Sequence, residues 1–217
     1  MRAAIAQAEA HAGRPQGSVR LLAVSKTKSV SEIRAALDAG QYDFGENYLQ
    51  EALTKIAQLK DEKIRWHFIG SIQSNKARDI AHHFDWVHSI EKISTAQRIA
   101  RLRPVTLPPL NVCLQVNIDQ EQSKSGCSIS QVHALADQIA QLPQLELRGL
   151  MAIPKPTSDT QRQYETFVEL HTLFEQMKPQ YENFDTLSAG MSGDFEQAIK
   201  AGATLMRIGT AIFGPRK

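Results

Sequence analysis

Short apolar runs alternate with amphipathic segments along almost the whole chain, and no other feature constrains the fold as strongly. The runs have the length of buried strands, and the segments between them have the period and flanking residues of helices. The predicted strands are Arg20–Ser25, Tyr42–Phe44, Arg65–Ile69, Trp86–His88, Leu110–Asn117, Leu145–Ala152, Thr186–Ser188 and Thr204–Ile208. The predicted helices are Met1–His11, Val30–Ala39 with Ser31 as its N-cap, Asn47–Leu59, Ser74–His83, Ile93–Leu102, Ser130–Gln141, Thr160–Met177 and Asp194–Ala201.

Strict alternation of strands and helices predicts an α/β fold with a parallel sheet covered by helices. About eight such units favour closure into a TIM-like (β/α)8 barrel, because open doubly wound sheets usually stop at about five or six strands. The first predicted helix precedes the first strand, so we expect an extra N-terminal helix in addition to the eight β/α units. No linker rich in Pro, Gly or Ser interrupts the pattern, so we expect one domain over residues 1–217.

Charge and composition argue against several classes of protein. The formal net charge is +2, and acidic and basic residues are interspersed, so we expect no nucleic-acid partner. No apolar run approaches the roughly 18 residues that a membrane span needs, and the N-terminus lacks the apolar core of a signal peptide. Cys113 and Cys127 lie far apart and cannot form a zinc site alone, which favours a reduced cytoplasmic setting.

Lys26 follows directly on the apolar run of the first predicted strand. Alternation along that strand points Leu22, Val24 and Lys26 into the barrel. Partial loss of water would favour the neutral amine of Lys26, which is the form that attacks an aldehyde. Spacing alone also permits a solvated Lys26 just past the strand, like Lys28.

Two turns near the C-terminus have the composition of a phosphate site. Residues 188–194 (SAGMSGD) connect the seventh strand to a helix, and residues 207–214 (RIGTAIFG) follow the eighth strand. In barrels the loops after these two strands often bind phosphate through backbone N–H groups and hydroxyls. The alternative is that Ser188 and Ser192 cap the following helix and that the glycines only make turns.

Arg207 lies in an apolar run and is predicted at or inside the barrel mouth. A buried guanidinium needs an acceptor, for which the pyridine nitrogen of pyridoxal 5′-phosphate (PLP) and an internal carboxylate such as Glu46 are two candidates. Asn47 and His67 also stand at strand ends and could border a ligand. His67 is equally consistent with a hydrogen-bonded core histidine.

Several motifs in order along nearly the whole chain resemble the pyridoxal phosphate homeostasis protein family, which is related to the N-terminal domain of alanine racemases. They are LLAVSKTK at 21–28, FGENYLQE at 44–51, WHFIG at 66–70, QSNK at 73–76, SKSG at 123–126, RGLM at 148–151 and the run at 207–214. The chain departs from the family in having Ala189 where Met is usual and Ser71-Ile72 where Pro-Leu is common. Neither departure touches Lys26 or Arg207.

The resemblance implies a monomeric barrel that holds PLP as a Schiff base on Lys26, with Arg207 beside the pyridine nitrogen and Asn47 at the side of the ring. An arginine there would leave the ring nitrogen unprotonated and weaken the ring as an electron sink. The phosphate site that the resemblance implies consists of Ser188, Ala189, Gly209 and Thr210.

The resemblance favours a role in PLP (vitamin B6) homeostasis, in which the protein delivers PLP to apoenzymes without efficient catalysis. Alanine racemase needs an acid–base residue from a second domain, and we expect no such domain after Lys217. A small PLP-dependent amino-acid racemase, a cofactor-free Schiff-base aldolase and a structural barrel are the alternatives. Lys28, Lys124 and Lys217 are candidates for a second PLP-handling site or are plain surface lysines.

Overall fold

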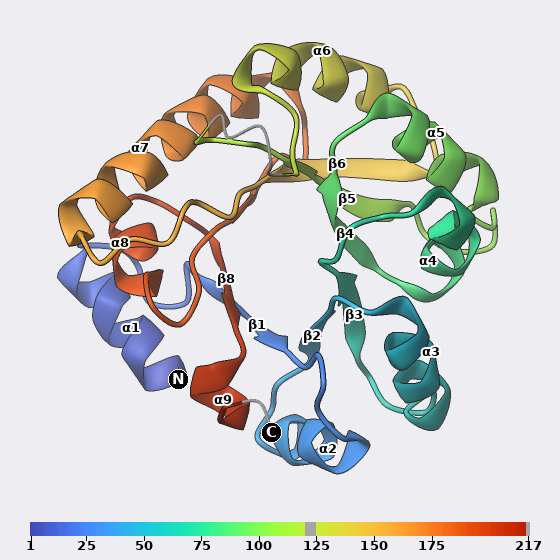
Figure 1. Ribbon diagram of the computed structural model, residues 1–217, viewed down its shortest axis with the longest axis horizontal. Coiled ribbons are helices and arrows are strands. Elements are labelled where there is room, and N and C mark those ends of the chain that lie inside the picture. The colour runs from blue at the N-terminus through green and yellow to red at the C-terminus, as the bar shows by residue number, and fades with distance from the viewer. Residues whose placement is uncertain (120–124, 216–217) are drawn as a thin grey trace.

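The computed structural model describes residues 1–119 and 125–215 and confirms the predicted TIM-like barrel. Eight parallel strands pair in sequence order, and β8 pairs with β1 to close the ring (Figure 1). The strands are β1 (Arg20–Val24), β2 (Asp43–Glu46), β3 (Arg65–Phe68), β4 (Trp86–Ile90), β5 (Leu110–Gln115), β6 (Leu145–Met151), β7 (Thr186–Ser188) and β8 (Leu205–Ile208).

Helices surround the ring on its outside. They are α1 (Arg2–His11), α2 (Val30–Asp38), α3 (Leu49–Gln58), α4 (Ala77–His83), α5 (Ile93–Leu102), α6 (Ile129–Ala140), α7 (Thr160–Met177), α8 (Phe195–Lys200) and α9 (Thr210–Phe213). Short 3-10 turns cover Ser74–Lys76 and Lys178–Gln180. Among the described residues, no helix has both the length and the apolarity that a membrane crossing requires.

Three local features differ from the predictions. The N-cap of α2 is Ser29 and not Ser31, because Ser29 forms a reciprocal capping box with Glu32. The predicted helix over Ser74–His83 begins instead as a 3-10 turn. Helix α9 was not predicted, since four residues are too few to show a helical period.

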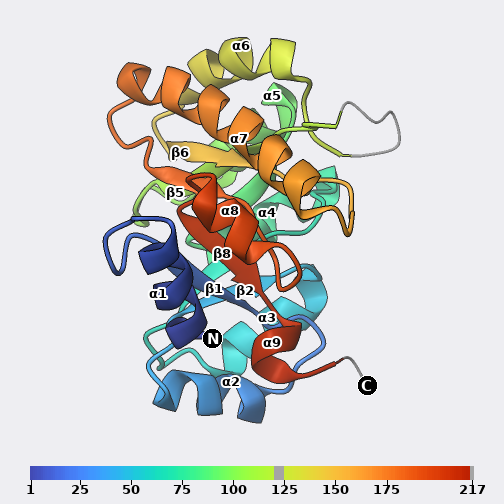
Figure 2. The same ribbon diagram turned by 90° about the vertical axis from the view of Figure 1, so that its left-hand side faces the viewer.

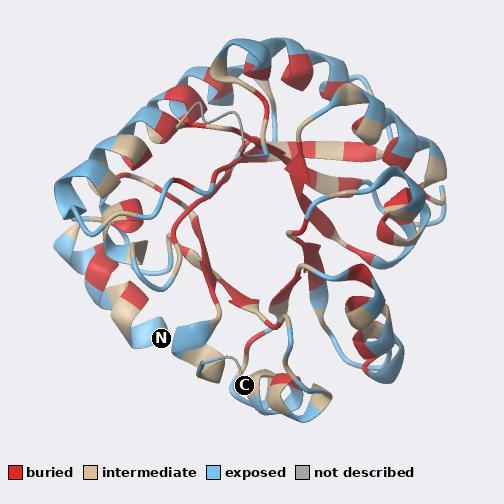
Figure 3. Cartoon of the chain, viewed as in Figure 1, coloured by how far each residue is buried: buried red, intermediate tan, exposed pale blue. Residues whose placement is uncertain are grey.

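Apolar side chains fill two separate layers. The larger layer lies between the strands and the helices, and it includes Phe44, Phe68 and Val87. Figure 3 shows the buried strands as a continuous ring, with buried residues on the inward sides of the helices. A smaller cluster of Trp86, Cys113 and Met151 is separate from the first, and alternation along the strands places it inside the barrel.

Candidate functional site

The predicted site residues gather at the C-terminal end of the barrel. Lys26 and Asn47 follow the ends of β1 and β2, and Ser188 is the last residue of β7. Arg207 lies within β8, and Gly209 and Thr210 come directly after it. Because all strands are parallel, their carboxyl ends share one rim, which brings these residues to the same opening.

The segment that carries Lys26 has a constrained backbone. Lys26 is half-buried between the buried Ser25 and Thr27, whose φ of 64° is unusual for a residue with a branched side chain. The amide of Ser25 donates to Gly45 O (2.9 Å), and the amide of Lys28 donates back to Ser25 O (3.0 Å). This turn therefore fixes where the side chain of Lys26 leaves the rim.

A buried cluster of charged groups holds the turn from behind. Lys55 Nζ donates to Ser25 O (2.7 Å), Glu46 Oε1 (2.8 Å) and Glu51 Oε1 (2.5 Å). Ser25 Oγ also donates to Glu46 Oε1 (2.6 Å), and the amide of Thr27 donates to Glu51 Oε1 (2.6 Å). Burial raises the pKa of Glu46 despite its bonds to Lys55 and Ser25. Both residues flanking Lys26 are thus bound to one cluster.

Lys28 is not a plain surface lysine. Its ammonium donates to the carbonyl oxygen of Phe213 (2.9 Å), at the end of α9, and to that of Pro215 (3.4 Å). Figure 2 shows α9 beside α2, whose first turn follows Lys28. Lys28 therefore connects the first rim segment to the last. The other two candidates for a second PLP site, Lys124 and Lys217, lie outside the described residues.

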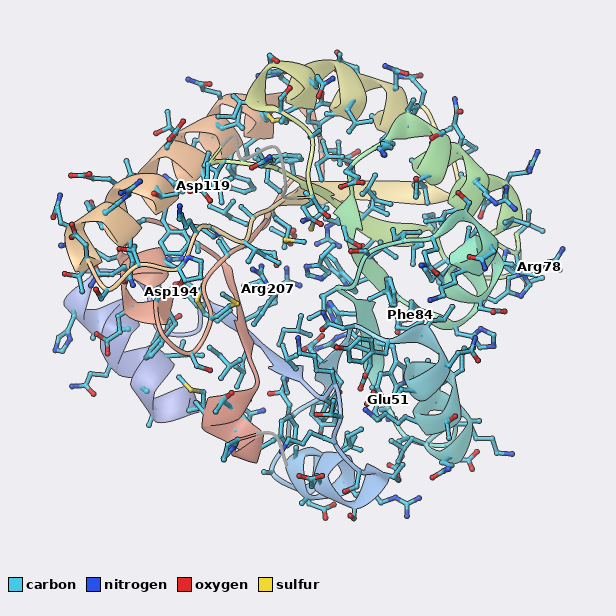
Figure 4. The ribbon with its side chains drawn as sticks, viewed as in Figure 1. Glu51, Arg78, Phe84, Asp119, Asp194 and Arg207 are labelled. Atoms are coloured by element: carbon cyan, nitrogen blue, oxygen red, sulfur yellow. The ribbon has the colours of Figure 1, made fainter. Side chains whose placement is uncertain are left out.

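Arg207 is the buried cation of the barrel mouth, with 4 % of its surface exposed. Figure 4 shows its side chain inside the ring of strands. Its guanidinium donates to Ser188 O (2.6 Å), Ser188 Oγ (2.8 Å) and Ala152 O (2.8 Å). Its other N–H groups have no hydrogen-bond partner among the described residues. Burial lowers the pKa of Arg207 to about 10. Glu46 is bound to Lys55 and Ser25, so the alternative of an Arg207–Glu46 pair is wrong.

A row of side chains continues from Ser188 down through the barrel. Ser188 Oγ lies 2.9 Å from His88 Nδ1, and His88 Nε2 lies 2.9 Å from His67 Nδ1. His67 Nε2 lies 3.1 Å from Asp43 Oδ1, and Asp43 also binds Arg65. His67 is thus a hydrogen-bonded core residue, which confirms the second of the two interpretations offered for it. His88 and Asp43 were not predicted as members of this row, because their partners are far away along the chain.

Asn47 presents an unsatisfied acceptor close to the rim. Its Oδ1 is buried and has no hydrogen-bond partner among the described residues. Gly70 packs against the Asn47 backbone so closely that a Cβ at position 70 would overlap the Asn47 carbonyl oxygen. A buried amide oxygen without a donor is costly, which marks this position as one that a bound ligand could satisfy.

The two predicted phosphate turns differ in which backbone and side-chain groups are accessible to a phosphate. Ala189 is fully buried and its amide donates to Leu205 O (3.2 Å), so that amide is engaged within the sheet. Helix α8 has Asp194 as its N-cap, so neither predicted serine caps it. Gly209 packs against Val24, and Thr210 is exposed at the first position of α9. Thr210 therefore faces solvent near the segment that carries Lys26.

Comparison with known proteins places these features in a family. Residues 1–217 match the family model described as alanine racemase, N-terminal domain. The chain is 55 % identical over 214 residues to the pyridoxal phosphate homeostasis protein of Pseudomonas aeruginosa, covering 99 % of this chain and 92 % of that one. This chain belongs to the pyridoxal phosphate homeostasis protein family. The Escherichia coli protein of the same name is 50 % identical over 215 residues, covering 98 % of this chain and 92 % of its own length.

Several solved structures resemble this barrel. PipY of Synechococcus elongatus, with PLP bound, is 36 % identical with a TM-score of 0.83, covering 97 % of this chain and 100 % of PipY. The structure of PipY without PLP gives a TM-score of 0.86 at 37 % identity, with the same coverage. Alanine racemase from Corynebacterium glutamicum shares the fold at 19 % identity and a TM-score of 0.66, covering 97 % of this chain and 61 % of that one.

Proposed function

We propose that this homeostasis protein binds PLP at the C-terminal end of its barrel, as a Schiff base on Lys26. The observation that carries the proposal is the pairing of β8 with β1, in which Arg207 lies opposite Leu22, four residues before Lys26. This pairing brings a half-buried amine and a buried guanidinium to the same opening. The names of the curated relatives and the PLP in PipY support the same ligand.

The residues present at the rim fit the functional groups of PLP. The Nζ of Lys26 would attack the aldehyde carbon and form a C=N bond, while the aldehyde oxygen leaves as water. Arg207 still has N–H groups that can donate to a ring nitrogen, and a guanidinium with a pKa of about 10 gives no proton away at neutral pH. The bound cofactor supplies an electrophilic carbon and an electron-withdrawing ring. Arg207 would keep that ring nitrogen unprotonated and limit catalysis.

We assign the remaining PLP contacts to groups whose hydrogen-bonding capacity is not already used within the protein. Asn47 Oδ1 lacks a partner among the described residues and would accept a hydrogen bond at the side of the ring. Gly209 and Thr210 begin α9 and would contact the phosphate, since the first amides of a helix have no helical acceptors. We assign Ser188 to Arg207 instead of to the phosphate, because its hydroxyl contacts Arg207 and His88. The amide of Ala189 donates to Leu205 O, so we likewise assign the phosphate contacts to Gly209 and Thr210 and not to Ala189.

We further infer that the protein is a cytoplasmic monomer that hands PLP to apoenzymes. Absence of a membrane-crossing helix among the described residues is compatible with that setting. Lys26 on an open rim would be reachable by a recipient enzyme, which suits release better than it suits guarded proton transfer.

Borohydride reduction of protein incubated with PLP tests the proposal directly. We expect wild-type protein to gain a visible absorption band and, after reduction, a pyridoxyl group on the peptide that contains Lys26. Lys26→Ala should lose both, while Lys92→Ala, whose side chain is exposed, should keep both. Equal labelling of wild type and Lys26→Ala would exclude Lys26 as the attachment point.

Transfer is tested separately from binding. Loaded protein mixed with an apoenzyme that needs PLP should restore that enzyme's activity faster than an equal amount of free PLP. Racemisation of L-alanine by the loaded protein at a rate above that of free PLP would favour the racemase alternative.

A further inference from the structure

We infer that His67 and His88 are positioning residues for Arg207, acting through Ser188 from inside the barrel. The role we assign to them is to fix the hydroxyl hydrogen of Ser188, so that its oxygen can only accept from Arg207. The inference deepens the proposed function, since Arg207 is the group proposed to meet the ring nitrogen of PLP. The hydrogen-bond pattern itself belongs to the protein without PLP.

The row of contacts crosses the barrel without a break. It runs from Arg207 to Ser188 Oγ (2.8 Å), on to His88 (2.9 Å), then to His67 (2.9 Å) and to Asp43 (3.1 Å). Arg207 lies on β8, Ser188 on β7, His88 on β4, His67 on β3 and Asp43 on β2. The row thus joins one wall of the barrel to the opposite wall through its interior.

The two ends of the row determine the direction of every hydrogen bond in it. An ionised carboxylate can only accept, so His67 must donate to Asp43 from Nε2. A neutral His67 then has a lone pair on Nδ1, which accepts from Nε2 of His88. His88 Nδ1 in turn accepts the hydroxyl hydrogen of Ser188, and Ser188 Oγ accepts from the Arg207 guanidinium.

The surroundings keep both rings neutral and Asp43 ionised. His67 and His88 have no exposed surface, and burial lowers the pKa of both, most strongly for His88. Burial raises the pKa of Asp43, but hydrogen bonds from Arg65 and His67 outweigh it and leave that pKa below its ordinary value. A doubly protonated His88 would donate toward Ser188 and reverse the pattern, so neutrality is a condition for the role.

The consequence for Arg207 is orientation. Its Nη1 is held by the carbonyl and hydroxyl oxygens of Ser188, and its Nη2 by Ala152 O. An apolar side chain at position 88 could fill the same volume but would not fix the Ser188 hydroxyl. Packing and hydrogen-bond direction are therefore separable by substitution.

Two variants whose side chains have the same number and branching of heavy atoms make that separation. Asn at position 88 places its amide oxygen close to the site of Nδ1 and can still accept from Ser188, whereas Leu cannot. In absorbance titrations with PLP we expect His88→Leu to weaken binding about tenfold and to shift the visible absorption maximum of the bound cofactor. His88→Asn should recover most of that loss. Equal losses in both variants would mean that position 88 acts by packing alone, and would overturn the inference.

A double-variant cycle tests the route through Ser188. In a Ser188→Ala background, which removes the hydroxyl, replacing His88 by Leu should weaken PLP binding little further. A full additional loss in that background would show that His88 reaches Arg207 by some other route.

Nitrogen-15 NMR of the apo-protein tests the pattern without any cofactor. We expect His67 and His88 to be neutral and to carry their ring hydrogen on Nε2, with signals assigned from the His88→Asn variant. A hydrogen on Nδ1 of His88 would overturn the inference even if Lys26 traps PLP. Failure of trapping with the expected NMR result would instead remove the proposed function and leave the buried row intact.

Discussion

His67 and His88 are buried as neutral rings, so the stability of the barrel must depend on pH. Burial holds the pKa of both rings below about 6.5, the ordinary value that a histidine in an unfolded chain approaches. Below pH 6.5 the unfolded state therefore binds more protons than the folded state, and stability falls as the pH falls. Each ring adds a slope of at most about 1.4 kcal/mol per pH unit, reached where the ring is protonated in the unfolded chain and still neutral in the folded protein. Stability from these groups is fully present above pH 6.5.

Urea unfolding at several pH values between 7.5 and 5 measures this slope. His88→Asn should reduce the pH dependence of the free energy of unfolding by the contribution of one histidine ring. His82→Asn, which removes an exposed histidine, should leave the slope as it is. A wild-type free energy of unfolding that does not change across this range would show that the two rings are protonated in the folded protein.

Lys55 is the cation on which the buried cluster behind Lys26 depends. Replacing it by Met would leave Glu46 buried without a positive partner, and breaking a buried pair in this way costs about 3–5 kcal/mol. Chemical denaturation should show that loss for Lys55→Met. Lys60→Met, at an exposed position, should change the free energy of unfolding by no more than about 0.5 kcal/mol. Similar values for the two variants would contradict the importance of the cluster.

Strands β6 and β7 approach each other closely at Gly149, which pairs with Thr186. Its φ is +150°, and a Cβ there would overlap the carbonyl oxygen of Thr186 on β7. We expect Gly149→Ala to destabilise the barrel by several kcal/mol, because the two strands would have to separate. Gly13→Ala also sits at positive φ but meets open space, so it should cost only about 1–2 kcal/mol. Thermal unfolding of both variants compares the two costs.

The elements were largely predictable because their signals are local. Apolar runs marked every strand to within a few residues, since each strand is covered on both faces and needs no partner to be recognised. The capping serine of α2 was misplaced although Ser29 and Glu32 have capping-box spacing in the sequence itself. Helix α9 was missed because four residues show no helical period, although Gly214 follows it at positive φ as a local stop signal.

The positions of Lys26 and Arg207 at the rim were predictable, because each residue lies in or just after an apolar run that marks a strand. The contact between Ser188 and His88 was not predictable, because the two residues lie far apart in the sequence. Ser188 contacts His88 from 100 residues away and also accepts a hydrogen bond from Arg207, which is why we propose that it serves Arg207 and not the phosphate. The residue types alone could not distinguish these two environments.

The barrel should unfold as one unit, because its two apolar layers share the same strands. Trp66 lies in the layer between strands and helices, and Trp86 lies in the inner cluster. The fluorescence of Trp66→Phe therefore reports the inner cluster through Trp86, and that of Trp86→Phe reports the outer layer through Trp66. We expect each variant's fluorescence transition to coincide with its own circular dichroism transition in urea. Separate midpoints would mean that one layer loosens before the other.

Closure of the ring through β8 and β1 has a consequence for the proposed transfer of PLP to other enzymes. Within residues 1–119 and 125–215, each of the eight strands has a neighbour on both sides, so the barrel offers no unpaired strand edge to another chain. Loss of PLP would open a space at the rim but would create no edge for aggregation. Emptied protein should thus stay dispersed until it is loaded again.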